Sequence, residues 1–226
     1  MRKITAVGPK LLLRSLKPIA VKKSALLYSF LAKIVPPTGD TPHKELSEQK
    51  AYPTQAEAKA AFEKAKDRLL HPQQWAGLTG NFGAAFQPFR ADCTEIWGKV
   101  TVGDYLKIDI PLPGDNYDWV KIEALEEISG NDEQIIGLRV RPTEDLEKPG
   151  HETAHFFSRE ATSTWVLHLE GKTLTALYFG RGEVPNEEAP GFWKGLRDTV
   201  VAWAGVAGFS DLQWQRLLQG LLGKEI

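Results

Sequence analysis

The stretch HETAH, residues 151–155, has residue types and a spacing that could do chemistry. It spells H-E-x-x-H, in which two histidines one helical turn apart bind zinc and the glutamate polarises the metal-bound water. Such a site would make the protein a zinc-dependent hydrolase, with His151 and His155 as ligands. It needs a helix that holds both histidines on one face, and a third ligand from elsewhere in the chain.

The elements around HETAH do not supply that helix. Pro149 and Gly150 stand directly before His151, so a helix would have to begin at the motif itself. A strand-like segment begins at residue 162, and spacing selects no third ligand. We therefore favour a polar loop at HETAH, predict no bound metal and no cofactor, and keep the zinc hydrolase as an alternative.

Other catalytic motifs are missing from the sequence. It holds no G-x-x-x-x-G-K-[ST] phosphate loop and no G-x-S-x-G nucleophile elbow. The sequence therefore predicts a protein that is not an enzyme, and it identifies no small-molecule substrate. Cys93 is the single cysteine, which excludes an intrachain disulfide and fits a reducing, cytoplasmic compartment.

Charge is distributed unevenly along the chain. Residues 1–39 carry eight basic side chains and no acidic ones; the basic residues are Arg2, Lys3, Lys10, Arg14, Lys17, Lys22, Lys23 and Lys33. Subtracting these eight from the 28 basic residues leaves 20 against 29 acidic ones, a balance of −9 for the remainder. We predict that this basic arm binds an acidic surface: a protein partner, nucleic acid, an anionic membrane or the protein's own body.

Periodicity predicts helices on both sides of a strand-rich centre. The arm, with an amphipathic helix over about 19–34 and a Pro-rich linker, occupies residues 1–47. Within residues 48–79, Thr54 and Glu57 form a capping box before a helix. The apolar stripe of this helix consists of Ala58, Phe62, Ala65 and Leu69. Residues 189–226 predict a pair of helices separated at Gly208.

Alternating apolar and polar residues fill the centre, residues 80–188. They predict strands at 93–110, 119–128, 133–141, 162–170 and 173–180, with a hairpin turn at Gly171-Lys172. About six short antiparallel strands suit a small closed or nearly closed β-barrel of SH3-like or OB-like kind. The predicted fold class is therefore α+β, a small barrel flanked by N-terminal and C-terminal helices.

Small barrels of this kind can bind nucleic acid by stacking bases on aromatic side chains. The aromatic residues available in the predicted strands and the loop between them are Trp97, Tyr105, Tyr117 and Trp119. Acidic residues gather around the hairpin at 123–133, however, and they repel phosphate. The sequence therefore disfavours nucleic acid as a partner, and a nucleic-acid-binding barrel remains a second alternative.

Three stretches resemble uncharacterised bacterial proteins, mainly of the Bacteroidota: GDYLKIDIPLPGDNYDWVKIE (103–123), RVRP (139–142) and AHFFSREATSTW (154–165). The resemblance implies no activity and no catalytic residue. Some such proteins accompany contractile-injection or secretion-like systems, which implies a subunit of an assembly. With the charged arm, this predicts a non-enzymatic interaction or structural subunit of a larger bacterial assembly, cytoplasmic and docking through its N-terminal arm.

Overall fold

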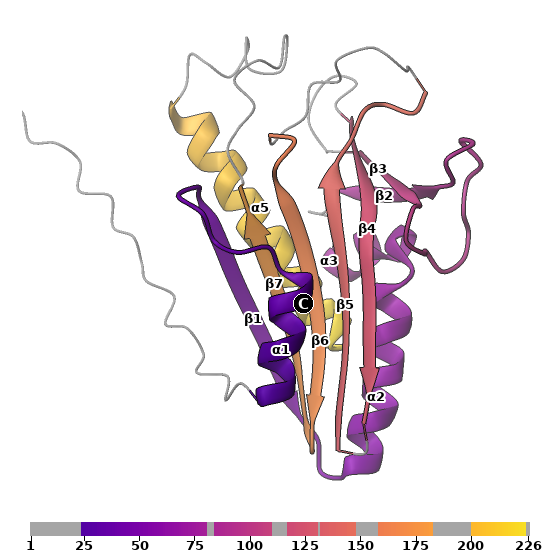
Figure 1. Ribbon diagram of the computed structural model, residues 1–226, viewed down its shortest axis with the longest axis vertical. Helices are drawn as coiled ribbons and strands as arrows, with labels where there is room; N and C mark the ends of the chain where they lie inside the picture. Colours follow the sequence, from indigo (N-terminus) through magenta and orange to yellow (C-terminus); the bar gives the residue numbers. More distant parts are fainter. Residues whose placement is uncertain are drawn as a thin grey trace, which may run out of the picture.

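The protein is built on one seven-stranded antiparallel sheet with helices on both of its faces, an α+β fold (Figure 1). The computed structural model describes residues 24–80, 84–109, 117–130, 132–147, 158–182 and 200–224, with the backbone alone for 200–210. The strands are β1 (His43–Ala51), β2 (Ala85–Phe89), β3 (Tyr105–Asp109), β4 (Tyr117–Ser129), β5 (Glu133–Pro142), β6 (Thr162–Glu170) and β7 (Thr173–Arg181). The helices are α1 (Ala25–Ile34), α2 (Gln55–Leu69), α3 (Trp75–Thr79) and α5 (Val200–Leu221), with a 3-10 turn, η1 (Pro72–Gln74).

The sheet is open, so the prediction of a closed SH3-like or OB-like barrel of about six strands was wrong. Its strand order is β1-β7-β6-β5-β4-β3-β2, which leaves β1 and β2 at opposite edges. The chain crosses from one edge to the other through α2, η1 and α3, then returns strand by strand until β7 pairs with β1. Strand β1 was not predicted, because its residues, HKELSEQKA, are mostly polar. Polar and charged residues are common in edge strands.

The segment 93–104 is a second difference from the prediction. It forms a loop between β2 and β3, not the first part of a long strand. Cys93 and Gly103 have φ values of 63° and 96°, which extended strands do not adopt. The alternation that indicated a strand places Ile96 and Val100 in the core instead.

Both faces of the central strands are buried, because helices cover both (Figure 1). The larger core lies between the sheet and α2, α3 and α5, and includes Leu138, Trp165 and Tyr178. The smaller core lies under α1, where Val166 and Leu177 contact its apolar face. Nearly every residue of β6 and β7 is therefore buried, including the polar Thr164, His168 and Thr175.

One predicted helix is confirmed in full and a second over the residues that the structure describes. Helix α2 begins after the Thr54–Glu57 capping box and buries the predicted stripe Ala58, Phe62, Ala65 and Leu69. Helix α1 forms the second half of the predicted amphipathic helix and begins at the N-cap Ser24. Its buried residues are Leu27, Phe30, Leu31 and Ile34, and burial of each such side chain contributes about 1.5–3 kcal/mol.

The C-terminal prediction needs a correction as well. Val200–Leu221 is one helix, α5, and it continues through Gly208 and Ser210, where the sequence indicated a break between two helices. A glycine inside a helix costs only about 1 kcal/mol relative to alanine. Packing of Leu217, Leu218 and Leu221 against the core outweighs that cost. The part of the predicted pair before residue 200 lies outside the described residues.

Candidate functional site

Most of the residues that the sequence singled out lie outside the described residues. This holds for HETAH, with His151 and His155, and for seven of the eight basic residues of the arm: Arg2, Lys3, Lys10, Arg14, Lys17, Lys22 and Lys23. The eighth, Lys33, lies on α1 and forms an ion pair with Glu126 of β4 at 2.7 Å. Within the described part of the chain, no group of three or more His, Cys, Asp or Glu side chains could hold a metal ion.

Helix α1 is docked on the sheet through polar contacts as well as apolar ones. Its C-terminal carbonyl, from Ile34, accepts a hydrogen bond from Arg139 Nη1 at 2.9 Å. At its start, the Ser24 hydroxyl accepts from the backbone N–H of Leu27 at 2.9 Å and donates to Glu133. Helix α1 is thus part of the body, and its apolar face is not available to a partner.

Ser24, Glu133 and His168 are the described side chains that come nearest to a catalytic constellation. His168 is 2 % exposed, and its Nε2 lies 2.8 Å from Glu133 Oε1. In a serine triad, however, the hydroxyl must bond to the histidine that takes its proton. Here the carboxylate stands between them, and the hydroxyl caps a helix. The arrangement anchors α1 and offers no activated nucleophile.

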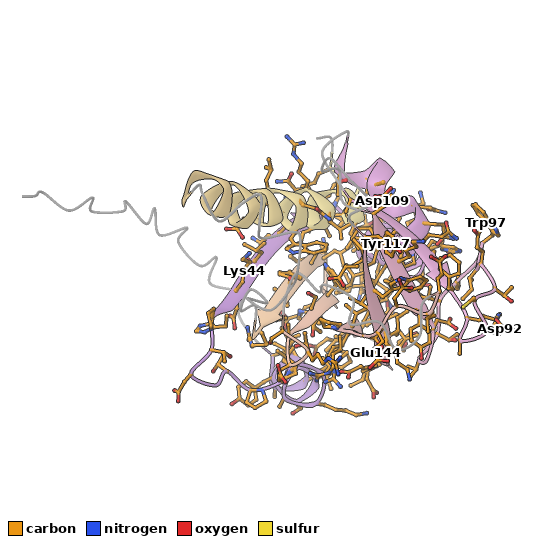
Figure 2. All side chains as sticks on the ribbon, turned by 90° about the horizontal axis from the view of Figure 1, so that it is seen from above. Lys44, Asp92, Trp97, Asp109, Tyr117 and Glu144 are labelled. Atoms are coloured by element: carbon orange, nitrogen blue, oxygen red, sulfur yellow. The ribbon has the colours of Figure 1, made fainter. Side chains whose placement is uncertain are left out.

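The structure separates the tryptophans into buried and exposed groups, which the sequence alone could not do. Of those whose side chains are described, Trp75, Trp119 and Trp165 are at most 1 % exposed, and Trp214 packs against the larger core. Trp97 is 75 % exposed. Figure 2 shows Trp97 at the outer edge of the molecule, together with Asp92 and far from Lys44 of β1.

The loop that carries Trp97 is fixed on both sides of this residue. The N–H of Ile96 donates to the carbonyl of Pro88 at 2.9 Å, and the N–H of Val100 donates to the carbonyl of Leu70 at 3.0 Å. Ile96 and Val100 are themselves 7 % and 1 % exposed. Two buried residues therefore anchor the loop while Trp97 between them projects into solvent.

Further contacts hold the base of the same loop. Gln73 donates from Nε2 to the carbonyl of Gly98, directly after Trp97, at 3.2 Å. Asp104 is buried and accepts from the backbone N–H and the hydroxyl of Thr101, at 2.7 and 3.1 Å. Contacts with Pro88, Leu70 and Gln73 therefore hold the loop in place, so that a ligand bound to Trp97 would not bear the entropy cost of ordering it.

The loop that carries Trp97 has one more exposed apolar residue and exposed charged residues. Val102 is 55 % exposed, and Glu95 and Asp92 are exposed acids on the same loop. Hydrogen bonds from the hydroxyl and backbone of Thr94 hold the pKa of Asp92 below its usual value, so this carboxylate is ionised at neutral pH. The loop therefore presents two exposed apolar side chains and two exposed carboxylates to solvent.

The aromatic residues proposed as a base-stacking platform are brought together only in part. Lys107 lies 4.3 Å from the ring centroid of Tyr117 and 5.6 Å from that of Trp119, and Lys121 lies 5.4 Å from that of Tyr105. Trp119 is fully buried, and Lys107 forms an ion pair with Glu147 at 2.7 Å. Trp119 therefore offers no face to a base.

Comparisons with known proteins give similarities of shape and none of sequence. No family model matches the chain, and neither does any curated protein sequence. A hypothetical protein from Helicobacter pylori has a TM-score of 0.44 at 10 % identity over 83 % of this chain and 91 % of its own. Protein TTHA0849 from Thermus thermophilus has a TM-score of 0.40 at 13 % identity, and the match covers 80 % of this chain and 95 % of that protein. Norcoclaurine synthase from Thalictrum flavum has a TM-score of 0.35 at 11 % identity, and the match covers 76 % of this chain and 86 % of that protein. At these identities no residue's role passes to this chain.

No described helix is long and apolar enough to cross a membrane.

Proposed function

We propose that this protein is a non-enzymatic interaction protein that recognises a protein partner by placing Trp97 in an apolar pocket of that partner. The observation that carries the proposal is the 75 % exposure of Trp97 on a loop whose flanking residues are buried and hydrogen-bonded. Single exposed apolar residues are ordinary on protein surfaces, but tryptophan is the residue most enriched where binding energy is concentrated. The fixed loop supplies the preorganisation that such an anchor needs.

The basic arm is a second contact in this proposal. Its cations add long-range attraction to an acidic partner and accelerate association, while Trp97 supplies the short-range apolar contact. In this role the protein is a cytoplasmic subunit of a larger bacterial assembly, as its resemblance to proteins associated with secretion-like systems implies. Two separate contacts on one chain raise the overall affinity above that of either alone.

Site-specific photo-cross-linking tests the proposal in living cells. A photoreactive phenylalanine analogue replaces Trp97 in one strain and Leu212 in another, because Leu212 is also an exposed apolar residue but lies on α5. We expect a discrete cross-linked protein from position 97 and none from position 212. The absence of any product at 97, or the same product from both positions, would contradict the proposed role of Trp97.

The arm is tested in the full-length chain by exchanging its seven basic residues before Ser24 for glutamine. Lys33 is kept, since it already pairs with Glu126. We expect slower association with the partner found by cross-linking, and a smaller dependence of the association rate on salt. Unchanged association kinetics would remove the arm from the proposed function.

A further inference from the structure

A groove lies where strand β1, helix α2 and the C-terminal end of α5 meet. Its volume is about 410 Å³, within the range of small-molecule sites. Its floor is apolar, since Ala61, Tyr52 and Leu222 pack at the edge of the larger core. Lys50, Lys64 and Arg68 contribute cations to its lining.

Two of these cations also hold the end of α5. Gly223, with φ at 63°, terminates the helix, and the N–H groups of Gly223 and Lys224 donate to the carbonyls of Gly220 and Gln219, each at 3.0 Å. Side chains donate hydrogen bonds to carbonyls that this turn leaves without a partner. Arg68 Nη1 donates to Leu221 at 3.0 Å, and Lys50 Nζ donates to Gly223 at 3.1 Å. Because a guanidinium has five N–H donors and an ammonium three, both side chains keep donors for a ligand.

Lys64 has no such structural task. It is exposed on α2, lines the groove, and forms no hydrogen bond or ion pair within the described part of the chain. The hydrogen bonds to the end of α5 account for the positions of Lys50 and Arg68, but they do not account for the presence of Lys64 in the groove. Three cations gather here although residues 40–226 as a whole have a balance of −9.

The lining as a whole carries an excess of positive charge, three cations against one carboxylate among the side chains that the structure describes. Glu57 is the single acid among the described side chains that line the groove, and its Oε2 accepts from the N–H of Thr54 at 3.2 Å in the capping box. Burial raises the pKa of the Tyr52 phenol, and the nearby Arg68 acts against this rise. Tyr52 is therefore a neutral hydrogen-bond donor at physiological pH.

We propose that this groove binds a small amphipathic carboxylate. The apolar part of the ligand lies on Ala61, Tyr52 and Leu222, and its carboxylate meets Arg68 and Lys64 at the rim. Arginine matches the two oxygens of a carboxylate in a bidentate geometry, while lysine contributes a point charge. An inorganic anion alone would leave the apolar floor exposed to water, and a neutral apolar molecule would leave the cations without a counter-charge. The ligand therefore needs both parts.

Titration of the full-length protein with three probes, followed by NMR chemical shifts or calorimetry, tests the proposal. Phenylbutyrate has both parts, phenylbutanamide has the same shape without the charge, and acetate has the charge without the apolar part. We expect saturable binding of phenylbutyrate and at least several-fold weaker binding of the other two. Equal binding of the acid and its amide, or no saturable binding of phenylbutyrate, would overturn the proposal.

Three substitutions on α2 locate the site. Ala60→Phe fills the groove from an exposed position and should abolish binding. Lys64→Gln should weaken binding by about two- to five-fold, the usual effect of an exposed charge pair. Lys59→Gln removes the same charge from the same helix outside the lining, and binding should not change. Thermal unfolding confirms that each variant is folded. Full binding by Ala60→Phe, or equal effects of the two lysine substitutions, would place the ligand elsewhere.

Discussion

Gly220 of α5 lies directly against the backbone of Leu78 in α3. A Cβ atom added at Gly220 would be 2.5 Å from the carbonyl oxygen of Leu78, far closer than such atoms approach. The absence of a side chain at Gly220 therefore lets the C-terminal helix approach α3, and it fixes how α5 lies on the larger core. Gly220 also accepts the N–H of Gly223 in the turn that ends the helix.

Gly220→Ala should lower the free energy of unfolding by about 1–3 kcal/mol, because the clash is with backbone atoms that cannot rotate away. Gly77→Ala is the matched control, since nothing lies within 4 Å of a Cβ added at Gly77 in α3. It should raise stability by up to about 0.5–1 kcal/mol through the better helix propensity of alanine. Denaturant unfolding of both variants measures the two effects. Equal free energies of unfolding for Gly220→Ala and Gly77→Ala would mean that α3 and α5 do not pack this closely.

Ser24→Ala should loosen α1 from the sheet. The substitution removes the N-cap of the helix and the contact with Glu133, at a cost of about 0.5–2 kcal/mol. Hydrogen exchange should become faster over residues 25–34 and remain slow in β6. Ser29→Ala is the control, because Ser29 is exposed and its hydroxyl contacts only the carbonyl of Ala25 within the same helix. Unaltered exchange over α1 in Ser24→Ala would show that Ser24 does not anchor the helix.

Glu48 of β1 makes the free energy of unfolding depend on pH in the acidic range. Burial acts to raise the pKa of Glu48, but hydrogen bonds from Lys224, Gln219 and Gln215 at the end of α5 outweigh it. The pKa in the folded protein is therefore below the usual 4.5. A carboxyl that binds protons less readily when folded contributes stability that is complete above pH 4.5 and is lost as the pH falls through the folded pKa.

Glu48→Gln should cost about 1–3 kcal/mol at neutral pH, because the partner groups lose a charged acceptor. The loss of stability on acidification should also become smaller, since the titrating group is gone. Unfolding free energies measured from neutral to acid pH test both points. Glu95→Gln removes one exposed carboxylate from the Trp97 loop and should leave the acid dependence as it is. Parallel acid profiles for wild type and Glu48→Gln would contradict this account.

Local sequence patterns predicted the helices and hairpins more accurately than they predicted the arrangement of the strands in the sheet. The Thr54–Glu57 capping box and the stripe at Phe62 are determined by neighbours within one or two turns, so the sequence displays them directly. The β6–β7 hairpin around Gly171 is equally local. Whether a sheet closes depends on which edge strands meet. The polar strand β1 gave no sign that it would pair with β7, far along the chain.

The candidate sites were harder to predict for the same reason. Ile96, Trp97 and Val100 are all apolar, and only the contacts of Val100 with Leu70 and of Ile96 with Pro88 decide which side chains point inward. The groove combines Lys50, Lys64 and Leu222 from three elements, so no short stretch of sequence contains it. The capping box at Thr54 and Glu57 was visible in the sequence, but its proximity to the end of α5 was not.

The most direct test of the central claim is the affinity of the cross-linked partner for three forms of the full-length protein: wild type, Trp97→Ala and Leu212→Ala. A hot-spot residue contributes at least about 2 kcal/mol, so we predict about 30-fold weaker binding by Trp97→Ala. Thermal stability should be unchanged, because Trp97 is 75 % exposed. Leu212→Ala should bind like wild type. Equal affinities for wild type and Trp97→Ala would contradict the proposal that Trp97 anchors the partner.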